Sequence, residues 1–384
     1  MKIVHPNGTI GIIGGGQLGR MMIYRSKKLG FRFAVLDENE APAQALSDVF
    51  IKGSLKDADA LEELSKVSDV LTYEIEHINT AALENIHSKG KVIYPSPDVL
   101  AVIQDKLLQK ELFVKKGLPT APFFKEDDPC KADFSARVFP LVQKSRREGY
   151  DGRGVKILKS ANDEPMSPPS IFEEMVDIDK ELAVMVSRSI DGSLALFPVT
   201  EMAFNPDHNI CDTVITPARI NEKTAAITRD IAVSVVESLN GIGIFGVELF
   251  LDTQGKVLVN EVAPRPHNSG HYTMEACVTC QFEQHVRAIC GLPLGDTTLL
   301  RPAVMVNLLG QPNSSGAVAV HGLDRALQVA GFSPHFYGKS QTRPFRKMGH
   351  FTVTSDTLED ALKKAEYVRS FLKISSITLT GETK

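Results

Sequence analysis

An apolar strand and a glycine-rich turn open the chain in the stretch TIGIIGGGQLG, residues 9–19. We expect a strand over Thr9–Ile13, followed by a helix that runs to about Leu29, where Gly30 ends it. The strands expected after it are Phe31–Leu36, Val70–Ile75 and Lys91–Tyr94, with helical stretches between them. This alternation predicts an α/β domain built on a doubly wound parallel sheet.

The turn itself, Gly14–Gly19, has the spacing GxGxxG, and Asp37 follows about twenty residues later at the end of the next strand. This is the spacing of a dinucleotide-binding turn, in which glycines let a phosphate approach the N-terminus of a helix. The physical requirement is a phosphate rather than a nicotinamide, so a phosphorylated sugar fits the turn equally well. We favour a substrate phosphate, while NAD and a purely structural turn remain alternatives.

The composition indicates a multi-domain soluble enzyme, because 384 residues with 43% hydrophobic side chains can bury a large core. The 43 basic and 47 acidic residues nearly balance, with no long run of one sign. Neither a nucleic-acid nor a membrane partner is therefore expected. The N-terminus lacks the apolar segment of a signal peptide, and a cytoplasmic location is the expectation.

The pattern changes after the first domain. A long helix is expected from Ser96 to about Lys116. Beyond Leu118 the sequence favours antiparallel hairpins, the clearest pairing Glu181–Ile190 with Ser193–Val199 across an Asp-Gly turn. A second hairpin joins Gly243–Leu251 to Lys256–Val262, and a third mixed region follows residue 294. The chain is thus α/β at its start and α+β in its middle.

A second glycine loop, KSRREGYDGRG at residues 144–154, lies between two expected strands. Three glycines within six positions suit a flexible flap over a triphosphate, and Lys144 is placed to neutralise phosphate charge. A bland hairpin turn needs only one glycine. The alternative for Lys144 is a solvated lysine at the end of a strand.

Acidic residues interrupt the apolar strands of the second hairpin at Glu248 and at Asn260-Glu261. Carboxylates in such strands are costly to bury unpaired. Two of them and an amide, brought together across a hairpin, make an oxygen site suited to Mg²⁺. A bulge or a slip of one residue would change the face that each occupies, and solvent-facing acids on an edge are the alternative.

The loop APRPHNSGH, residues 263–271, follows the second of these strands and is dense in hydrogen-bond donors. Arg265, His267 and Asn268 would lie beside the metal and the triphosphate, where an anionic intermediate needs stabilisation. A single histidine is usually structural, but His267 and His271 occur here together with an arginine and an amide.

The order of these motifs resembles the 5-(carboxyamino)imidazole ribonucleotide synthase family of purine biosynthesis, across almost the whole chain. The runs GYDGRG at 149–154 and HNSGH at 267–271 are the most specific. The resemblance implies an ATP-grasp fold with a Rossmann-like N-terminal domain at residues 1–97, an ATP-grasp domain at 98–295 and a small C-terminal domain at 296–384. It also implies a ligase that uses ATP, Mg²⁺ and bicarbonate.

The resemblance further implies the residues of each subsite. Those implied for ATP are Lys106, Lys144, Gly149, Tyr150, Asp151, Gly152, Arg153, Gly154, Val155, Glu173, Glu174, Met175, Val176, Glu181, Asn260 and Glu261. Those implied for aminoimidazole ribonucleotide are Gly16, Gln17, Leu18, Glu76, Tyr150, Arg153, His271, Lys339, Arg346 and Lys347. Glu248, Asn260 and Glu261 would hold magnesium, and Arg265, His267, Asn268 and Lys144 would be catalytic. Phe204 departs from the family, which commonly has a histidine there.

The implied reaction forms carboxyphosphate from ATP and bicarbonate and then carboxylates the nucleotide's amine. The alternatives are a formate-dependent ATP-grasp ligase acting on glycinamide ribonucleotide, a NAD-dependent oxidoreductase and a non-catalytic nucleotide sensor. The donor loop favours carboxylation over the first, and the second glycine loop has no use in a dehydrogenase. A homodimer is the default expectation for a soluble enzyme.

Overall fold

The computed structural model describes residues 3–38, 41–149, 154–205 and 210–377. A parallel sheet in the order β3-β2-β1-β4-β5 opens the chain, as the alternating pattern predicted. Its strands are β1 Thr9–Ile13, β2 Arg32–Asp37, β3 Val49–Lys52, β4 Val70–Tyr73 and β5 Val92–Ile93. The helices around it are α1 Gln17–Ser26, α2 Ala58–Lys66 and α3 Thr80–Ser88. The sequence analysis missed β3, which is short and only partly buried.

The helix expected from Ser96 to Lys116 is two helices, α4 Pro97–Ile103 and α5 Lys106–Lys115. Asp105 separates them because its backbone is extended and its carboxylate caps α5 by accepting the N–H of Leu107. The same buried carboxylate accepts two hydrogen bonds from Arg146, at 3.1 and 2.7 Å. A partner distant in sequence thus sets the break, which places Lys106 at the start of a new helix.

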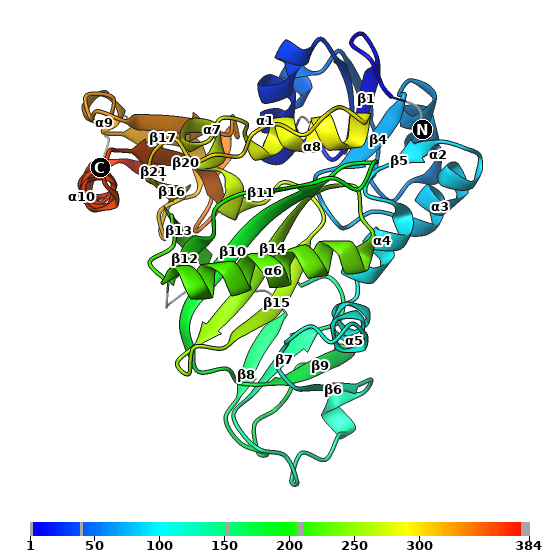
Figure 1. The fold of residues 1–384 in the computed structure, drawn as a ribbon, viewed down its shortest axis with the longest axis vertical. Coiled ribbons are helices and arrows are strands. Elements are labelled where there is room, and N and C mark those ends of the chain that lie inside the picture. The colour runs from blue at the N-terminus through cyan, green and yellow to red at the C-terminus, as the bar shows by residue number, and fades with distance from the viewer. Residues whose placement is uncertain (1–2, 39–40, 150–153, 206–209, 378–384) are drawn as a thin grey trace.

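A four-stranded antiparallel sheet follows in the order β6-β9-β7-β8. Its strands are β6 Phe123–Glu126, β7 Leu141–Ser145, β8 Val155–Leu158 and β9 Ser170–Glu174. It forms the lower end of the molecule in Figure 1, below the helix α6, Glu222–Leu239. The antiparallel arrangement predicted for this part of the chain is confirmed.

The largest sheet has nine strands and runs from the middle of the chain into its C-terminal part. In spatial order its strands are β15 Val257–Ala263, β14 Gly243–Asp252, β10 Ile178–Arg188, β12 Thr200–Asn205, β13 Ile210–Thr216, β16 Ala303–Leu309, β20 Lys347–Thr354 and β18 Phe332–Phe336, with β11 Leu194–Leu196 beside β10. Both predicted hairpins are present. The pairing of β13 with β16 makes strands of the C-terminal part members of this sheet.

The remaining elements complete the C-terminal part and the connection to it. They are α7 Thr273–Ala276, α8 Gln281–Cys290, α9 Leu323–Ala326, α10 Leu358–Phe371, and the three-stranded sheet of β17 Gly316–His321, β19 Gln341–Thr342 and β21 Lys373–Ser376. Helix α8 packs beside α1 at the top of Figure 1. Within the described residues, no helix is long and apolar enough to cross a membrane.

His285 on α8 joins the parallel sheet to the large sheet. Its Nδ1 accepts the backbone N–H of Ile244 on β14 at 3.0 Å, so the ring proton must be on Nε2. Nε2 then donates to the hydroxyl of Thr72 on β4 at 2.7 Å. The side chain is completely buried, and burial lowers its pKa to about 3. The contact therefore requires a neutral histidine.

Stability should accordingly fall as the pH drops below about 6.5. The unfolded chain protonates His285 near the ordinary pKa of 6.5, whereas the native ring stays neutral down to about pH 3. Each such histidine contributes a slope of about 1.4 kcal/mol per pH unit in that window. Urea unfolding at several pH values between those limits measures the slope. In His285→Gln the slope should decrease by one proton's contribution, and an unchanged slope would contradict the assignment.

Candidate active site

The acidic residues of the second hairpin lie together because β15 contains a bulge. Glu248 on β14 is opposite Glu261 on β15, while Leu249 is opposite Val259, so Asn260 is the extra residue. Val259 and Val262 both pack into the core beneath α6. The bulge therefore turns Asn260 and Glu261 to the other face, where the Asn260 amide donates to Glu248 at 3.4 Å.

Two lysines from different elements face these oxygens. Lys106, the first residue of α5, pairs directly with the Glu261 carboxylate. Lys144 on β7 donates to the side-chain oxygen of Asn260 at 2.9 Å and to Glu173 at 3.0 Å. Together with Gln109, Lys110 and Ile171 they line one small cavity. The structure thus brings together residues predicted for ATP and for the metal. They come from α5, the four-stranded sheet and the hairpin of β14 and β15, here called the metal hairpin or acidic hairpin.

Glu173, predicted within the adenine segment, is buried and bridges two lysines. One of its oxygens meets Lys144, and the other lies 3.1 Å from Lys110. The other side chains of the segment differ from it, since Glu174 and Met175 are exposed and Val176 is half-buried. In this structure Glu173 therefore forms ion pairs with both lysines and holds them in place. Lys110 was missed by the sequence analysis, although its spacing of four residues from Lys106 on one helix was a usable signal.

The charges of this cluster favour a further cation. Lys106 holds the pKa of Glu261 well below its usual range, whereas burial and the nearby Glu261 raise the pKa of Glu248. Burial also raises the pKa of Glu181 to about 7. No described group of three or more His, Cys, Asp or Glu residues could hold a metal. Two carboxylates and an amide nevertheless suit Mg²⁺ when phosphate oxygens and water complete the shell.

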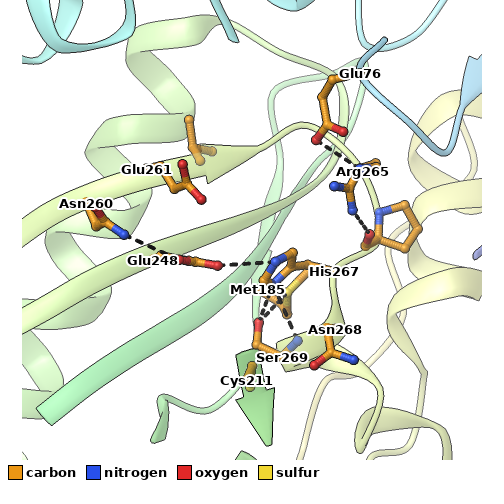
Figure 2. Close-up of polar contacts among 12 residues, drawn as sticks. Glu76, Met185, Cys211, Glu248, Asn260, Glu261, Arg265, His267, Asn268 and Ser269 are labelled. Carbon is orange, nitrogen blue, oxygen red and sulfur yellow. Dashed lines mark hydrogen bonds and ion pairs between the residues drawn. The ribbon is translucent and has the colours of Figure 1, made fainter. Parts of the chain in front are cut away.

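The donor loop after β15 contacts this cluster directly, as Figure 2 shows. His267 Nε2 lies 3.2 Å from Glu248, and its Nδ1 lies 2.9 Å from the Ser269 hydroxyl. Arg265 pairs with Glu76 at 2.9 Å, which ties the loop to the segment after β4. The loop therefore lies between the acidic hairpin and the parallel sheet.

The hydrogen-bond partners of Asn268 and His271 lie outside the acidic hairpin. The Asn268 amide exchanges two hydrogen bonds with Asn307 on β16, at 2.9 and 2.8 Å. His271 is 1% exposed, and its Nδ1 lies 2.9 Å from the side-chain nitrogen of Gln281. Neither Asn307 nor Gln281 was predicted. Asn307 lies 39 residues from Asn268 in the sequence, and Gln281, only ten residues from His271, belongs to the helix after the loop and has no local signal.

At Gly16 the structure differs from the prediction of a phosphate-binding amide. Glu74, buried at the end of β4, accepts the backbone N–H groups of Gly16 and Gly19 at the start of α1. Asp37 accepts the N–H of Gly15 at 2.6 Å. A Cβ at Gly16 would lie 2.4 Å from Glu74, so the turn needs glycine there to admit the chain's own carboxylate. This arrangement also leaves the turn poorly suited to a dinucleotide.

The predicted C-terminal cations lie near this turn. Lys339 donates to the carbonyl oxygen of Lys347 at 2.8 Å, and burial lowers its pKa to about 8, with Arg346 adding to the effect and Glu74 opposing it. Arg346 donates to the carbonyl of Gln341 at 2.6 Å. Lys339 therefore lies within electrostatic range of the carboxylate that occupies the turn. Tyr150, Asp151, Gly152 and Arg153 lie outside the described residues.

A cluster of buried lysines and carboxylates lies on two antiparallel sheets, which follow a Rossmann-like domain along the chain. This combination is typical of an ATP-grasp ligase. Family models match in the same order: a ribonucleotide synthetase preATP-grasp domain at residues 8–104, an ATP-grasp domain at 111–282 and a phosphoribosylaminoimidazole carboxylase C-terminal domain at 303–364. The chain belongs to the N5-carboxyaminoimidazole ribonucleotide synthase family.

The chain is similar to members of this family over nearly its whole length. The synthase of Bacillus subtilis is 38% identical over 91% of this chain and 92% of its own. The crystal structure of the Thermotoga maritima synthetase has a TM-score of 0.90 and 50% identity, covering 96% of this chain and all of that one. The Aspergillus clavatus synthase, solved with ADP and 5-aminoimidazole ribonucleotide, has a TM-score of 0.87 and 32% identity, covering 95% and 98%. The chain spans about two thirds of the fungal phosphoribosylaminoimidazole carboxylases that it matches.

Proposed function

We propose that this protein carboxylates the amine of 5-aminoimidazole ribonucleotide, using ATP and bicarbonate, and that the reaction passes through carboxyphosphate. The contact between His267 and Glu248 carries the proposal, because it joins the donor loop to the lysine–carboxylate cluster. Phosphoryl transfer depends mainly on positioning and on offsetting charge, and this cluster can do both. The family membership of the chain and its relatives' ligands support the same reaction.

The roles proposed for ATP begin with Lys106 and Lys144 on its phosphates, with residues 149–155 above them. Glu173–Val176 and Glu181 would hold the base and ribose. Glu173 would in addition orient Lys144 toward the phosphates. Glu248, Asn260 and Glu261 fit a magnesium ion, which when bound supplies positive charge at the phosphates. Lys144 already binds Asn260, so one side chain can contact both ATP and the metal hairpin.

For the carboxyl group, we assign Arg265 and His267 to the stabilisation of carboxyphosphate next to the amine. Both are held by carboxylates, Glu76 and Glu248, which keep their donors beside the hairpin. Asn268 would act in the same loop, with Asn307 setting its orientation. Positioned donors of this kind are effective because they need no reorganisation when charge develops.

The nucleotide would lie against Gln17, Leu18, Glu76, Tyr150, Arg153 and His271, with its phosphate on Lys339, Arg346 and Lys347. The domain bounds 1–97, 98–295 and 296–384, a homodimer and a cytoplasmic location belong to the same proposal. Phe204 packs partly buried beside the core that contains Cys211 and Met305. A hydrophobic role there accounts for the absence of a histidine.

The direct test is phosphate release from ATP by the purified protein. We expect release with aminoimidazole ribonucleotide plus bicarbonate and none above background with glycinamide ribonucleotide plus formate. Release only with the second pair would identify the formate-dependent ligase. Omission of bicarbonate from the first pair is the control, because it separates carboxylation from idle ATP hydrolysis.

Arg346→Ala should raise the Michaelis constant for the ribonucleotide about ten- to hundredfold, since one charge-assisted contact contributes about 1.5–3 kcal/mol. The constant for ATP should stay nearly unchanged, because its phosphates are assigned to other lysines. Steady-state kinetics with each substrate varied in turn measures both constants. Arg325→Ala, a change on the surface-exposed α9 where Arg325 binds Tyr367, is the control. A defect confined to ATP would show that the two phosphate sites are assigned in reverse.

Mg-ATP should raise the melting temperature by binding the native state, whereas NAD should not. The turn that resembles a dinucleotide site is filled by Glu74 and Asp37. Differential scanning fluorimetry with each ligand measures the two shifts. A shift with NAD alone would favour the oxidoreductase alternative.

A further inference from the structure

Gln281, the first residue of α8, lies completely buried beneath the donor loop. Its side-chain oxygen accepts the backbone N–H of His267 at 2.9 Å, and its side-chain nitrogen donates to the carbonyl oxygen of His267 at 2.9 Å. Since a backbone N–H can only donate, the orientation of the Gln281 amide is fixed. The amide thus clasps the backbone of the residue whose ring faces Glu248.

The second N–H of the same amide determines the protonation of His271. The Gln281 nitrogen lies 2.9 Å from Nδ1 of His271 and can only donate, so Nδ1 must accept. His271 is therefore neutral, with its proton on Nε2. A protonated ring would place two donors against each other in a site that excludes water.

The surroundings of His271 favour the same state. Burial lowers its pKa well below the ordinary value, and the side chains that act on it most strongly are basic and lower it further. They are His267 and Arg265 from its own loop, His335 from β18 and Lys347 from β20. The ring of His350 on β20 also lies 4.7 Å from that of His271. None of these is a carboxylate that would stabilise an imidazolium.

The loop also packs tightly on the amide. A Cβ at Gly270 would lie 2.5 Å from the Gln281 side-chain oxygen and 2.8 Å from Met185. The hydroxyl of Thr273 donates to the Gly270 carbonyl at 2.6 Å and accepts the backbone N–H of Gln281 at 2.9 Å. The backbone of the loop is therefore held against α8 along several residues.

We propose that Gln281 is a positioning residue for the reaction: it holds the His267 backbone and keeps His271 as the neutral tautomer that donates through Nε2. This inference rests on the proposed function, in which His271 contacts the nucleotide. In that state His271 can orient an acceptor on the nucleotide without adding a positive charge or releasing a proton. Its role is then to position the substrate, and proton transfer belongs to another group.

Gln281→Glu tests the proposal because it keeps an acceptor for the His267 N–H and replaces the donor opposite His271 Nδ1 by a carboxylate oxygen. The imidazolium of His271 becomes favourable. We expect kcat to fall about 10- to 100-fold, the cost of a misplaced or wrongly protonated group. The Michaelis constant for ATP should change less than about twofold, and activity should recover as the pH rises above the new pKa of His271.

The chain supplies a matched control in Gln284, one turn further along α8. It is also completely buried, and its amide clasps the backbone N–H and carbonyl of Gly295, both at 2.7 Å, with no histidine partner in the contacts of the described residues. Gln284→Glu therefore makes the same chemical change in the same kind of clasp. It should lower the melting temperature in a comparable way without altering the pH–rate profile.

Histidine ¹⁵N NMR gives a readout that needs no substrate, with the His271 signal identified by its loss in His271→Gln. In the unaltered protein Nδ1 of His271 should be unprotonated between about pH 6 and 8, and it should be protonated at neutral pH in Gln281→Glu only. A proton on Nδ1 of the unaltered protein, or equal pH–rate profiles for the two glutamate variants, would overturn the proposal. Absence of carboxylation by the unaltered protein would count against the proposed function alone.

Discussion

Glu261→Gln should reduce the rate of carboxylation at least about 1,000-fold, and Glu248→Gln should do nearly the same. In either variant a neutral amide replaces one of the two carboxylates that face each other across the bulge. An uncharged amide holds magnesium more weakly than a carboxylate, and the change at Glu261 also removes the ion pair with Lys106. Lys106 would then no longer be fixed relative to the hairpin, so the two could not position the phosphates of ATP together.

Phosphate release measures the loss, and the melting temperature shows whether the fold survives. Glu237→Gln is the matched control, since it removes one carboxylate from the exposed face of α6 on the same domain. We expect full activity from it. Activity within about twofold of the unaltered protein in both Glu248→Gln and Glu261→Gln would contradict the assignment of the magnesium site to this hairpin.

The sequence predicted much of this fold because its local signals agree with the tertiary arrangement. The strand at Thr9–Ile13 matches the predicted range, since it has an unbroken apolar pattern and ends at a glycine turn. The second predicted hairpin is likewise present, as β14 paired with β15. The expected helix over residues 96–116 was wrong in one respect. Its pattern is continuous, but Arg146, some forty residues away, binds Asp105 and ends the first helix there.

The site was predictable in its residue types but not in its partners. Acids within apolar strands indicated a buried oxygen site, and the hairpin brought Glu248 and Glu261 together. The bulge at Asn260 has no local signal, although it decides which face that amide occupies. Glu74 is the clearest example of a missed partner. It directly follows Tyr73 at the end of a strand, yet only the fold shows that its carboxylate accepts the N–H groups of the glycine turn.

Lys144→Met should lower kcat/KM for ATP about 100- to 1,000-fold, because it removes a positioned charge from the phosphates. In the structure Lys144 joins Glu173 on β9 to Asn260 on β15, and so connects the four-stranded sheet to the metal hairpin. Methionine keeps most of the length of the side chain but can make neither contact. The loss should appear with ATP as the varied substrate, measured by phosphate release at saturating ribonucleotide and bicarbonate.

Two further lysines separate the possible causes of that loss. Lys156, which is exposed on β8 beside Gln143, provides a charge-matched control, and Lys156→Met should be fully active. Lys110→Met removes the other partner of Glu173 but no contact with Asn260, so it should cost stability as Lys144→Met does while reducing kcat/KM less. If the two variants lose activity equally, the effect runs through the unpaired Glu173 carboxylate. Only a larger loss at Lys144 assigns that lysine to the phosphates of ATP.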